Sequence, residues 1–340
     1  MKRNAENITQ YEEPDWRRLL KPYREQRRAR ALLLLLEAFG PALLFTVIAY
    51  LCRDGCYPVT LVFCVLAGLS MMRIFSVQHD IGHGSFTRDR RLADALGFCC
   101  GVITLTPYQY WRRVHHNHHR HTANLSDRDH GDFPIMTVDE YQRASRWERL
   151  RYRVMRHPAF LLGLIPALLF FVIQRLPIKV DQVTPSELRS VHWTNVALLG
   201  ALYVAQRTLG WGALLEVQLP IYLSFSTCGI FLFFIHHQYE DAYWADESER
   251  SFYLTAIRGS AHLDFGPILN WFMGHTEYHH IHHLSPSIPS YQLQRAHQDH
   301  PCLHPRQSMT LSAAVRTFRF TLWDRQAQRL VRFEDVSLEP

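Results

Sequence analysis

Clustered histidines are the residues in this sequence with the most evident capacity for chemistry. The chain has 21 histidines, and five of them fall within the nine residues from His275 to His283, in the stretch "HTEYHHIHHLSPSIP". Further clusters are "HDIGH", which starts at His79, "WRRVHHNHHRH", and a histidine pair in "FIHHQYED". Imidazole is the commonest metal ligand in proteins and suits iron, zinc and copper. The clusters therefore indicate a metal site.

Helical geometry separates the clustered histidines that share a face from those that do not. Residues at i, i+3 and i+4 lie on one face of a helix. That spacing selects eight histidines, and a ninth ends an apolar run where its ring can point at the same site. The nine are His79, His83, His115, His118, His119, His237, His279, His282 and His283. His116 and His280 lie about 100° from the first member of their sets, so we expect them near the ligands or facing solvent.

The number and type of these side chains restrict the metal. One ion takes about three to six ligands, so nine histidines fit two ions. Zinc hydrolases would show HExxH or a closed Cys/His set, and neither occurs. Soluble carboxylate-bridged diiron proteins use two ExxH motifs, whereas this chain has one, which begins at Glu277. The seven cysteines form no CxxC pair, which argues against a zinc or iron–sulfur site. A nearly all-histidine diiron site remains.

Long apolar runs identify the elements that must position these histidines. Residues 31–52 contain one ionisable side chain, Glu37, and at about 1.5 Å per residue they can cross a bilayer. Residues 57–77 form a second span. The net charge of +6 comes from arginines before the first span and between residues 88 and 153, which places these regions in the cytoplasm. Spans on either side make nucleic-acid binding a poor explanation of the basic clusters.

The parity of the remaining apolar runs sets the topology. Runs at 158–174, 191–210 and 212–235 follow, and the run at 92–105 is too short to cross. One shared metal site requires an even number of crossings between its histidines. The run at 158–174 is the shortest and contains Gly163 and Pro166, so we expect it to be re-entrant or interfacial. The sequence thus predicts an all-α integral membrane protein with four spans, at about 31–52, 57–77, 191–210 and 212–235.

Several motifs carry a resemblance to a known family. HxxxH at His79, HxxHH at His115 and HxxHH at His279 resemble the three histidine boxes of the membrane fatty acid desaturases. "QHDIGHGSF", "GVITLTPYQYW", "GDFPIMTVDEY", "HHQYEDAYW" and "YHHIHHLSPSIPSYQL" are similar to the bacterial acyl-lipid desaturases of the Δ5 and Δ12 (ω-6) group. The resemblance covers residues 30–300. It implies four transmembrane helices under a cytoplasmic helical cap, two iron ions held by the nine histidines, and an acyl chain in a buried tunnel.

The resemblance also implies roles and domain limits. Asp80 would accept a hydrogen bond from the second ring nitrogen of a ligand. His275 and Glu277 stand where the family has a small or amide-bearing residue and a glycine, so either could approach the metals. We expect a cytoplasmic segment at 1–30, the membrane domain at 31–310 and a cytoplasmic tail at 311–340. The active site and both termini would face the cytoplasm, at a bacterial inner membrane.

The expected reaction is O2-dependent introduction of a cis double bond into a lipid-linked acyl chain. The chain shows no flavin, nicotinamide or haem module, so electrons would come from a separate ferredoxin or cytochrome b5-like donor with its reductase. We expect an acidic donor to dock beside Arg112, Arg113, Arg120 and Arg128. A hydroxylase or ketolase on the same scaffold is the alternative enzyme. A histidine-rich metal transporter or store is the non-enzymatic alternative, but it would place polar ligands across the bilayer.

Overall fold

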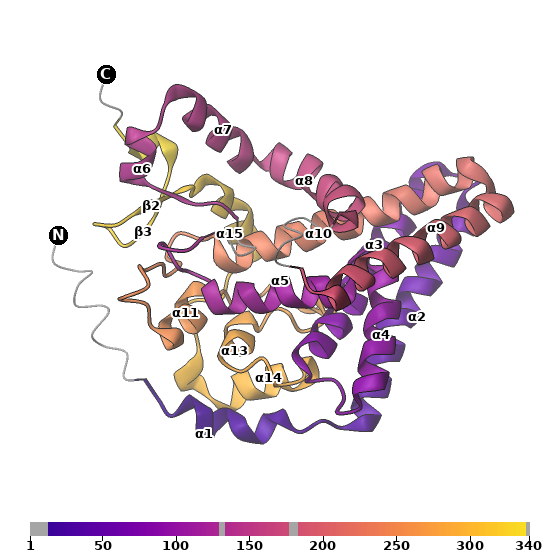
Figure 1. The fold of residues 1–340 in the computed structure, drawn as a ribbon, viewed down its shortest axis with the longest axis horizontal. Helices are drawn as coiled ribbons and strands as arrows, with labels where there is room; N and C mark the ends of the chain where they lie inside the picture. The colour runs from indigo at the N-terminus through magenta and orange to yellow at the C-terminus, as the bar shows by residue number, and fades with distance from the viewer. Residues whose placement is uncertain (1–12, 129–132, 177–182, 338–340) are drawn as a thin grey trace.

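The computed structural model describes residues 13–128, 133–176 and 183–337 (Figure 1). The first twelve residues of the predicted 1–30 segment and the last three of the predicted 311–340 tail lie outside these ranges. So do the first two residues of the "GDFPIMTVDEY" motif. The described chain is mainly helical, and its histidine-bearing helices meet near the middle of the molecule.

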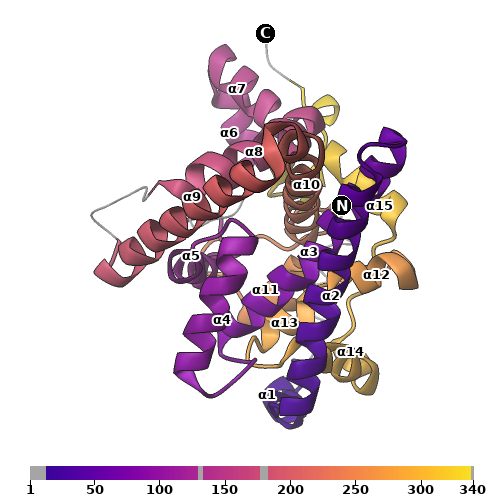
Figure 2. The ribbon, with the colours of Figure 1, turned by 90° about the vertical axis from the view of Figure 1, so that its right-hand side faces the viewer.

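Three continuous helical stretches are long and apolar enough to cross a membrane. They are α2 (Arg28–Cys52), α3 (Tyr57–His83) and the stretch Pro185–His237, which comprises α9 (Pro185–Ala213), the π-helical turn η6 (Leu214–Gln218) and α10 (Leu219–His237). Gly210 has a φ of 79° and breaks the third stretch, so α9 and α10 leave it in different directions (Figures 1 and 2). The four predicted spans lie within these helices, and the predicted break between the last two coincides with Gly210.

Helix α3 is the central element of the membrane region. It packs against α2 on one side and α10 on the other, and its last turns also contact α4 (Arg90–Ile103), α5 (Tyr108–His121) and α12 (Pro267–Met273). Gly68 allows the closest approach, because a Cβ there would lie 2.6 Å from the carbonyl oxygen of Ile221 on α10. Cys64, one turn earlier, is fully buried and donates to the carbonyl oxygen of Val217 at 3.5 Å.

The apolar run at 158–174 forms an irregular helical segment. It consists of η2 (Phe160–Leu164), α8 (Ile165–Ala167), η3 (Leu168–Val172) and η4 (Ile173–Arg175), of which η2 and η3 have π-type turns. The segment is bent by 58° from α7 (Arg146–Arg156), so the pair is either a broken span or a re-entrant loop. Phe170 packs edge-on against Phe225, at 5.4 Å between ring centroids, so the segment lies beside α10.

Short helices make up most of the remaining structure. They are α1 (Trp16–Leu20), η1 (Lys21–Arg24), α6 (Val138–Arg143), α11 (Phe252–Gly259), α13 (His279–Leu284), α14 (Ser290–Asp299), η7 (Pro301–Leu303), α15 (Leu311–Arg316), η8 (Thr317–Arg319) and η9 (Phe333–Asp335). Helix α1 lies beside α14 at the lower edge of Figure 1. There Trp16 stacks on Phe252, and the Tyr23 hydroxyl donates to Asp299 at 2.7 Å.

A small sheet corrects the expectation of an all-α protein. Strand β2 (Leu322–Asp324) pairs in parallel with β1 (Met136–Thr137) and antiparallel with β3 (Arg329–Val331). Trp323 and Leu330 on this sheet are almost fully buried, so the described part of the 311–340 region packs onto the protein instead of extending from it. The strands have only two or three residues each, too few for an alternating pattern to be recognised in a sequence.

Candidate metal centre

The eight histidines selected by their spacing converge in the structure together with His237. Within each of two groups, the ring nitrogens all lie within 4.8 Å of one another. The first group is His79, His83, His115, His119 and His282, and the second is His118, His237, His279 and His283. The groups are adjacent, since the rings of His119 and His283 stack at 4.2 Å. Among the described residues, no other group of three or more histidine, cysteine or carboxylate side chains meets this criterion.

Four helices supply the nine rings, and each ends close to its histidines. Helix α3 stops directly after His83, at Gly84, whose φ of 70° is the left-handed conformation that glycine adopts readily. His237 is the last residue of α10. Helix α13 has only six residues and carries three of the rings, and α5 carries three more at the same spacing. The i, i+3, i+4 pattern therefore becomes one facing surface on each of two short helices.

The ring nitrogens within each group lie about as far apart as two nitrogens bound to one metal ion. Nε2 of His119 lies 3.1 Å from Nε2 of His115 and 3.0 Å from Nε2 of His282. In the second group, Nε2 of His279 lies 3.0 Å from that of His237 and 3.1 Å from that of His283. Two nitrogens bound to one ion at about 2.1 Å and at right angles are about 3.0 Å apart. The spacing fits ligands of a common metal ion.

The protonation state of the rings suits metal binding. Burial lowers the pKa of His115, His119, His279, His282 and His283 well below the usual value, and neighbouring imidazoles lower it further. These rings are neutral at neutral pH, and each has a nitrogen lone pair to donate. Nε2 of His83 is buried and has no hydrogen-bond partner among the described residues, as expected for a nitrogen that would bind a metal ion.

Contacts outside the two groups orient individual rings. Nδ1 of His237 lies 2.8 Å from the carbonyl oxygen of Gly259, so Nδ1 carries the proton and Nε2 faces His279 of the second group at 3.0 Å. Trp111 stacks on His115 with 4.9 Å between centroids, and Phe233 packs against His118 at 5.0 Å. Trp111, in the "PYQYW" stretch, therefore fixes the orientation of the His115 ring, which the spacing of the histidines does not determine.

Asp80 contacts the first residue of α14. Its side-chain Oδ2 accepts a hydrogen bond of 2.8 Å from the backbone amide of Ser290, and the residue is 2% exposed. The carboxylate therefore anchors the first residue of α14 to the end of α3, and a contact with a histidine ring stays a prediction. The sequence could not reveal this contact, because Ser290 lies 210 residues further along the chain.

The other residues expected near the metals have different positions. His116 is exposed, with its ring 5.4 Å from that of His83. His280 is a buried residue of α13, and its Nε2 lies 3.1 Å from Nδ1 of His297 on α14. Neither histidine group includes Glu277, which is 5% exposed and whose pKa burial raises to about 7. His275 is half-buried and directly follows Gly274. Its backbone has a positive φ of 71°.

An apolar cavity of about 280 Å³ lies against both histidine groups. His79, His115, His118, His279 and His282 form part of its wall. The opposite wall comprises side chains of α3, of the irregular segment and of α10, among them Met72, Phe75, Phe170, Phe225, Ile230 and Phe233. His236 also lines it and stacks on His279 at 4.1 Å, a role that its position beside His237 in the sequence did not reveal. The cavity can hold a hydrocarbon chain next to bound metal.

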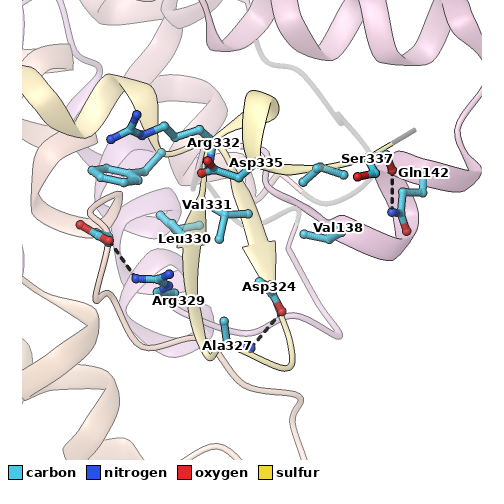
Figure 3. A pocket seen from close by; sticks show the side chains of 13 residues that line it. Val138, Gln142, Asp324, Ala327, Arg329, Leu330, Val331, Arg332, Asp335 and Ser337 are labelled. Atoms are coloured by element: carbon cyan, nitrogen blue, oxygen red, sulfur yellow. Dashed lines mark hydrogen bonds and ion pairs between the residues drawn. The ribbon is translucent and has the colours of Figure 1, made fainter. Parts of the chain in front are cut away.

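A larger cavity of about 650 Å³ has no relation to the histidines (Figure 3). It lies where the β2–β3 turn meets α6, and the described residues that line it include no histidine or cysteine. Figure 3 shows it bounded by hydrogen bonds from Gln142 to the Ser337 carbonyl oxygen and from the Ala327 amide to Asp324. These contacts stabilise the sheet, and we assign this cavity no role in the chemistry.

Fold and site together define a class: a helical membrane protein with two adjacent histidine clusters beside an apolar cavity. The chain belongs to the fatty acid desaturase family, whose model matches residues 57–312. It is 35% identical to a fatty acid desaturase of Bacillus subtilis over 310 residues, which cover 91% of this chain and 88% of that protein. It is therefore an oxidoreductase of the desaturase type.

Two cyanobacterial relatives are more distant. An sn-1 acyl-lipid omega-3 desaturase (ferredoxin) of Nostoc sp. is 30% identical over 75% of this chain and 70% of its own length. An sn-1 oleoyl-lipid 12-desaturase of Synechocystis sp. is 26% identical over 71% of this chain and 67% of its own length.

Proposed function

We propose that this protein is an O2-dependent diiron desaturase that introduces a cis double bond into a lipid-linked acyl chain. The observation that carries the proposal is the contact between two histidine clusters and an apolar cavity. When bound, two iron ions would supply the activation of O2 that removal of hydrogen from an unactivated methylene requires. His79, His83, His115, His119 and His282 would hold one iron, and His118, His237, His279 and His283 the other.

The protein itself would position the alkyl chain of the substrate and exclude water from it. Side chains from α3, α10 and the irregular segment enclose the cavity, so an alkyl chain within it is shielded from water. A hydrocarbon offers no polar group near the reacting carbons, so only the shape of the wall can select which methylenes face the histidines. Phe225 and Phe170 contact each other within this wall. We expect these two side chains to limit how far the alkyl chain enters.

The electron donor is inferred from the name of a relative and from the arginines near the histidines. The relative from Nostoc sp. is named for ferredoxin, which supports a separate small electron carrier for this chain. Of the four arginines expected at the docking site, Arg112 donates to the Gly82 carbonyl oxygen, Arg113 pairs with Glu187 and Arg128 pairs with Glu140. Arg120 is exposed. The proposed docking surface therefore centres on Arg120, and the paired arginines serve the fold.

We further propose four membrane spans, with 160–175 re-entrant and the histidines and both termini cytoplasmic. Arg156, at the end of α7, donates to the carbonyl oxygens of Pro134 and Phe320, which belong to the part that contains the sheet. Glu187, at the start of α9, pairs with Arg113 on the histidine-bearing α5 at 3.3 Å. The segment thus leaves and returns on the histidine side, which supports a re-entrant loop.

The function is tested by the fatty-acid profile of a heterologous bacterial host that expresses the chain. We expect a new species two mass units lighter than its saturated parent, absent when His118→Ala is expressed instead. Fragmentation of the new species gives the double-bond position. The exposed His192 provides the matched control, because His192→Ala removes an imidazole far from the clusters and should leave the product unchanged.

Other outcomes discriminate among the alternatives. A product that has gained oxygen would identify a hydroxylase or ketolase on the same scaffold. An unchanged profile from protein that carries two irons per chain and is supplied with reduced ferredoxin would contradict desaturation of the host's lipids. An unchanged profile from protein without iron would contradict the ligand assignment itself.

A further inference from the structure

A second cavity lies beside the apolar one and has a different character. Its volume is about 620 Å³, and its wall includes four arginines: Arg27, Arg30, Arg73 and Arg295. Two carboxyl side chains, Glu37 and Glu277, also line it. The lining residues therefore include an excess of guanidinium groups. Guanidinium groups bind phosphate esters through paired, charge-assisted hydrogen bonds.

The four arginines differ in how firmly they are held. Arg73 is 2% exposed, and its guanidinium donates to Glu37 at 2.5 Å and to the Trp271 carbonyl oxygen, so it forms a fixed part of the wall. Arg27 pairs with Glu25 at 3.0 Å, and Arg295 pairs with Asp299 at 3.4 Å, in contacts between exposed side chains. Exposed pairs contribute little free energy, so an incoming anion can compete for these guanidinium groups.

The cavity lies at the expected level of the membrane surface. Arg27 and Arg30 flank the start of α2, the first helix long and apolar enough to span. On the other side, α12 exposes Ile268 (73%) and Trp271 (39%), an exposed apolar pair typical of a helix that touches the membrane interface. Leu33 of α2 also lines the cavity. A ligand can therefore enter sideways from the lipid, with its charged part among the arginines.

His275 lies between the two cavities. It lines the basic cavity and the apolar cavity alike. Its position is fixed by the preceding Gly274, where a Cβ would lie 3.0 Å from Cβ of Ser76, and by the hydrogen bond of the Ser76 hydroxyl to the Gly274 carbonyl oxygen at 2.6 Å. One molecule with a charged head and a hydrocarbon tail can thus occupy both cavities, with its ester linkage beside His275.

We propose that the basic cavity binds the phosphodiester of a membrane glycerophospholipid whose acyl chain passes His275 into the apolar cavity. This inference rests on the proposed function and names its substrate class. Acyl-coenzyme A also carries phosphates, but it is a soluble molecule that needs no lipid-facing entrance. The exposed apolar face of α12 and the leucines of α2 that follow Arg30 favour a ligand that arrives through the bilayer.

The test measures which lipids the full-length protein retains in a neutral detergent, by native mass spectrometry. The probes are dioleoyl-phosphatidylglycerol and dioleoylglycerol, which share their acyl chains and differ in the phosphate-bearing head. We expect a preference of about tenfold for phosphatidylglycerol, and its loss in the double variant Arg30→Gln/Arg295→Gln. The double variant Arg146→Gln/Arg151→Gln removes the same charge from exposed positions of α7 and should retain the preference.

Three outcomes would overturn the proposal. Equal retention of the two probes by the unaltered protein would exclude recognition of the phosphate. Undiminished preference in Arg30→Gln/Arg295→Gln would place the recognition elsewhere. Displacement of phosphatidylglycerol by an equal concentration of palmitoyl-coenzyme A would assign the cavity to a soluble thioester. Because retention does not depend on turnover, an absence of new double bonds in the host contradicts the proposed function separately from any of these results.

Discussion

At the scale of single residues, spacing on a helix identified the histidines that converge but not the contacts that support them. Eight of the nine rings were recognisable because helical spacing is local and survives folding unchanged, and His237 was recognisable from its position at the end of an apolar run. The partners of Asp80 and His280 are distant in sequence, at Ser290 and His297, and no local pattern encodes them. A residue next to a ligand in the sequence can thus serve the packing of another helix.

Asp80 provides a test of that distinction. In Asp80→Ala the buried amide of Ser290 loses its acceptor, so we expect the free energy of unfolding to fall by about 1–3 kcal/mol. Iron content should stay unchanged. Thermal unfolding and metal analysis of Asp80→Ala and Asp80→Asn provide the measurement. A loss of iron at unchanged melting temperature would show instead that the carboxylate orients a ligand.

The buried imidazoles predict an acid-sensitive protein in the absence of metal. Burial lowers the pKa of His119 and His283 well below the usual value. The unfolded chain, with pKa values near about 6.5, binds more protons below that pH than the folded chain does. Stability should be full above pH 7 and fall as the pH decreases, by about 1.4 kcal/mol for each such histidine at pH 5.5. Melting temperatures of metal-free protein between pH 5 and 8 check this, and a flat profile would contradict it.

At the scale of elements, the apolar runs specified the helices but not their mutual distances. Runs of about 20 apolar residues must be helical in a bilayer, so α2, α3 and α10 were predictable. Which face of α3 meets α10 was not, because both helices are apolar on all sides and neither has a polar face to exclude. Only the structure shows that Gly68 lies at this contact, because a Cβ there would lie 2.6 Å from the carbonyl oxygen of Ile221.

Gly68→Ala tests how far the site depends on this close approach. The added methyl group would meet the Ile221 carbonyl oxygen and the Phe225 amide, so α10 must shift away from α3. We expect a loss of stability of about 1–3 kcal/mol and a lower iron content, because α10 carries His237. Gly200→Ala is the matched control: nothing lies within 4 Å of its Cβ position, and it should be neutral or slightly stabilising.

At the scale of the whole molecule, two turns that are distant in sequence meet at one end. Nε of Arg53, in the turn between α2 and α3, lies 2.6 Å from Oε2 of Glu216, in the turn between α9 and α10. The Tyr57 hydroxyl donates to the Glu216 carbonyl oxygen nearby. The histidines lie at the opposite ends of α3 and α10. This arrangement is compatible with an even number of crossings between the histidines, whereas the sheet that joins residues 136–137 to 322–331 depends on pairings too short to predict.

Two native cysteines report the proposed orientation. Cys56 is exposed in the first of these turns, and Cys302 is exposed on the histidine side, after α14. In intact cells that express variants with a single cysteine, a membrane-impermeant maleimide should label Cys56 and spare Cys302. Both should react after permeabilisation. The reverse pattern would invert the proposed topology, and labelling of both in intact cells would contradict the four-span arrangement.

The contact between α1 and α14 has a consequence for biosynthesis. Tyr23 emerges from the ribosome early, yet its hydrogen-bond partner Asp299 follows 276 residues later. At roughly 5–20 residues per second, that interval is about 14–55 s, during which Trp16, Leu20 and Tyr23 have no surface to cover. Helix α14 is itself tied to α3 through Asp80. Helix α1 is therefore among the last elements to dock, and it does so only after the third histidine cluster has been synthesised.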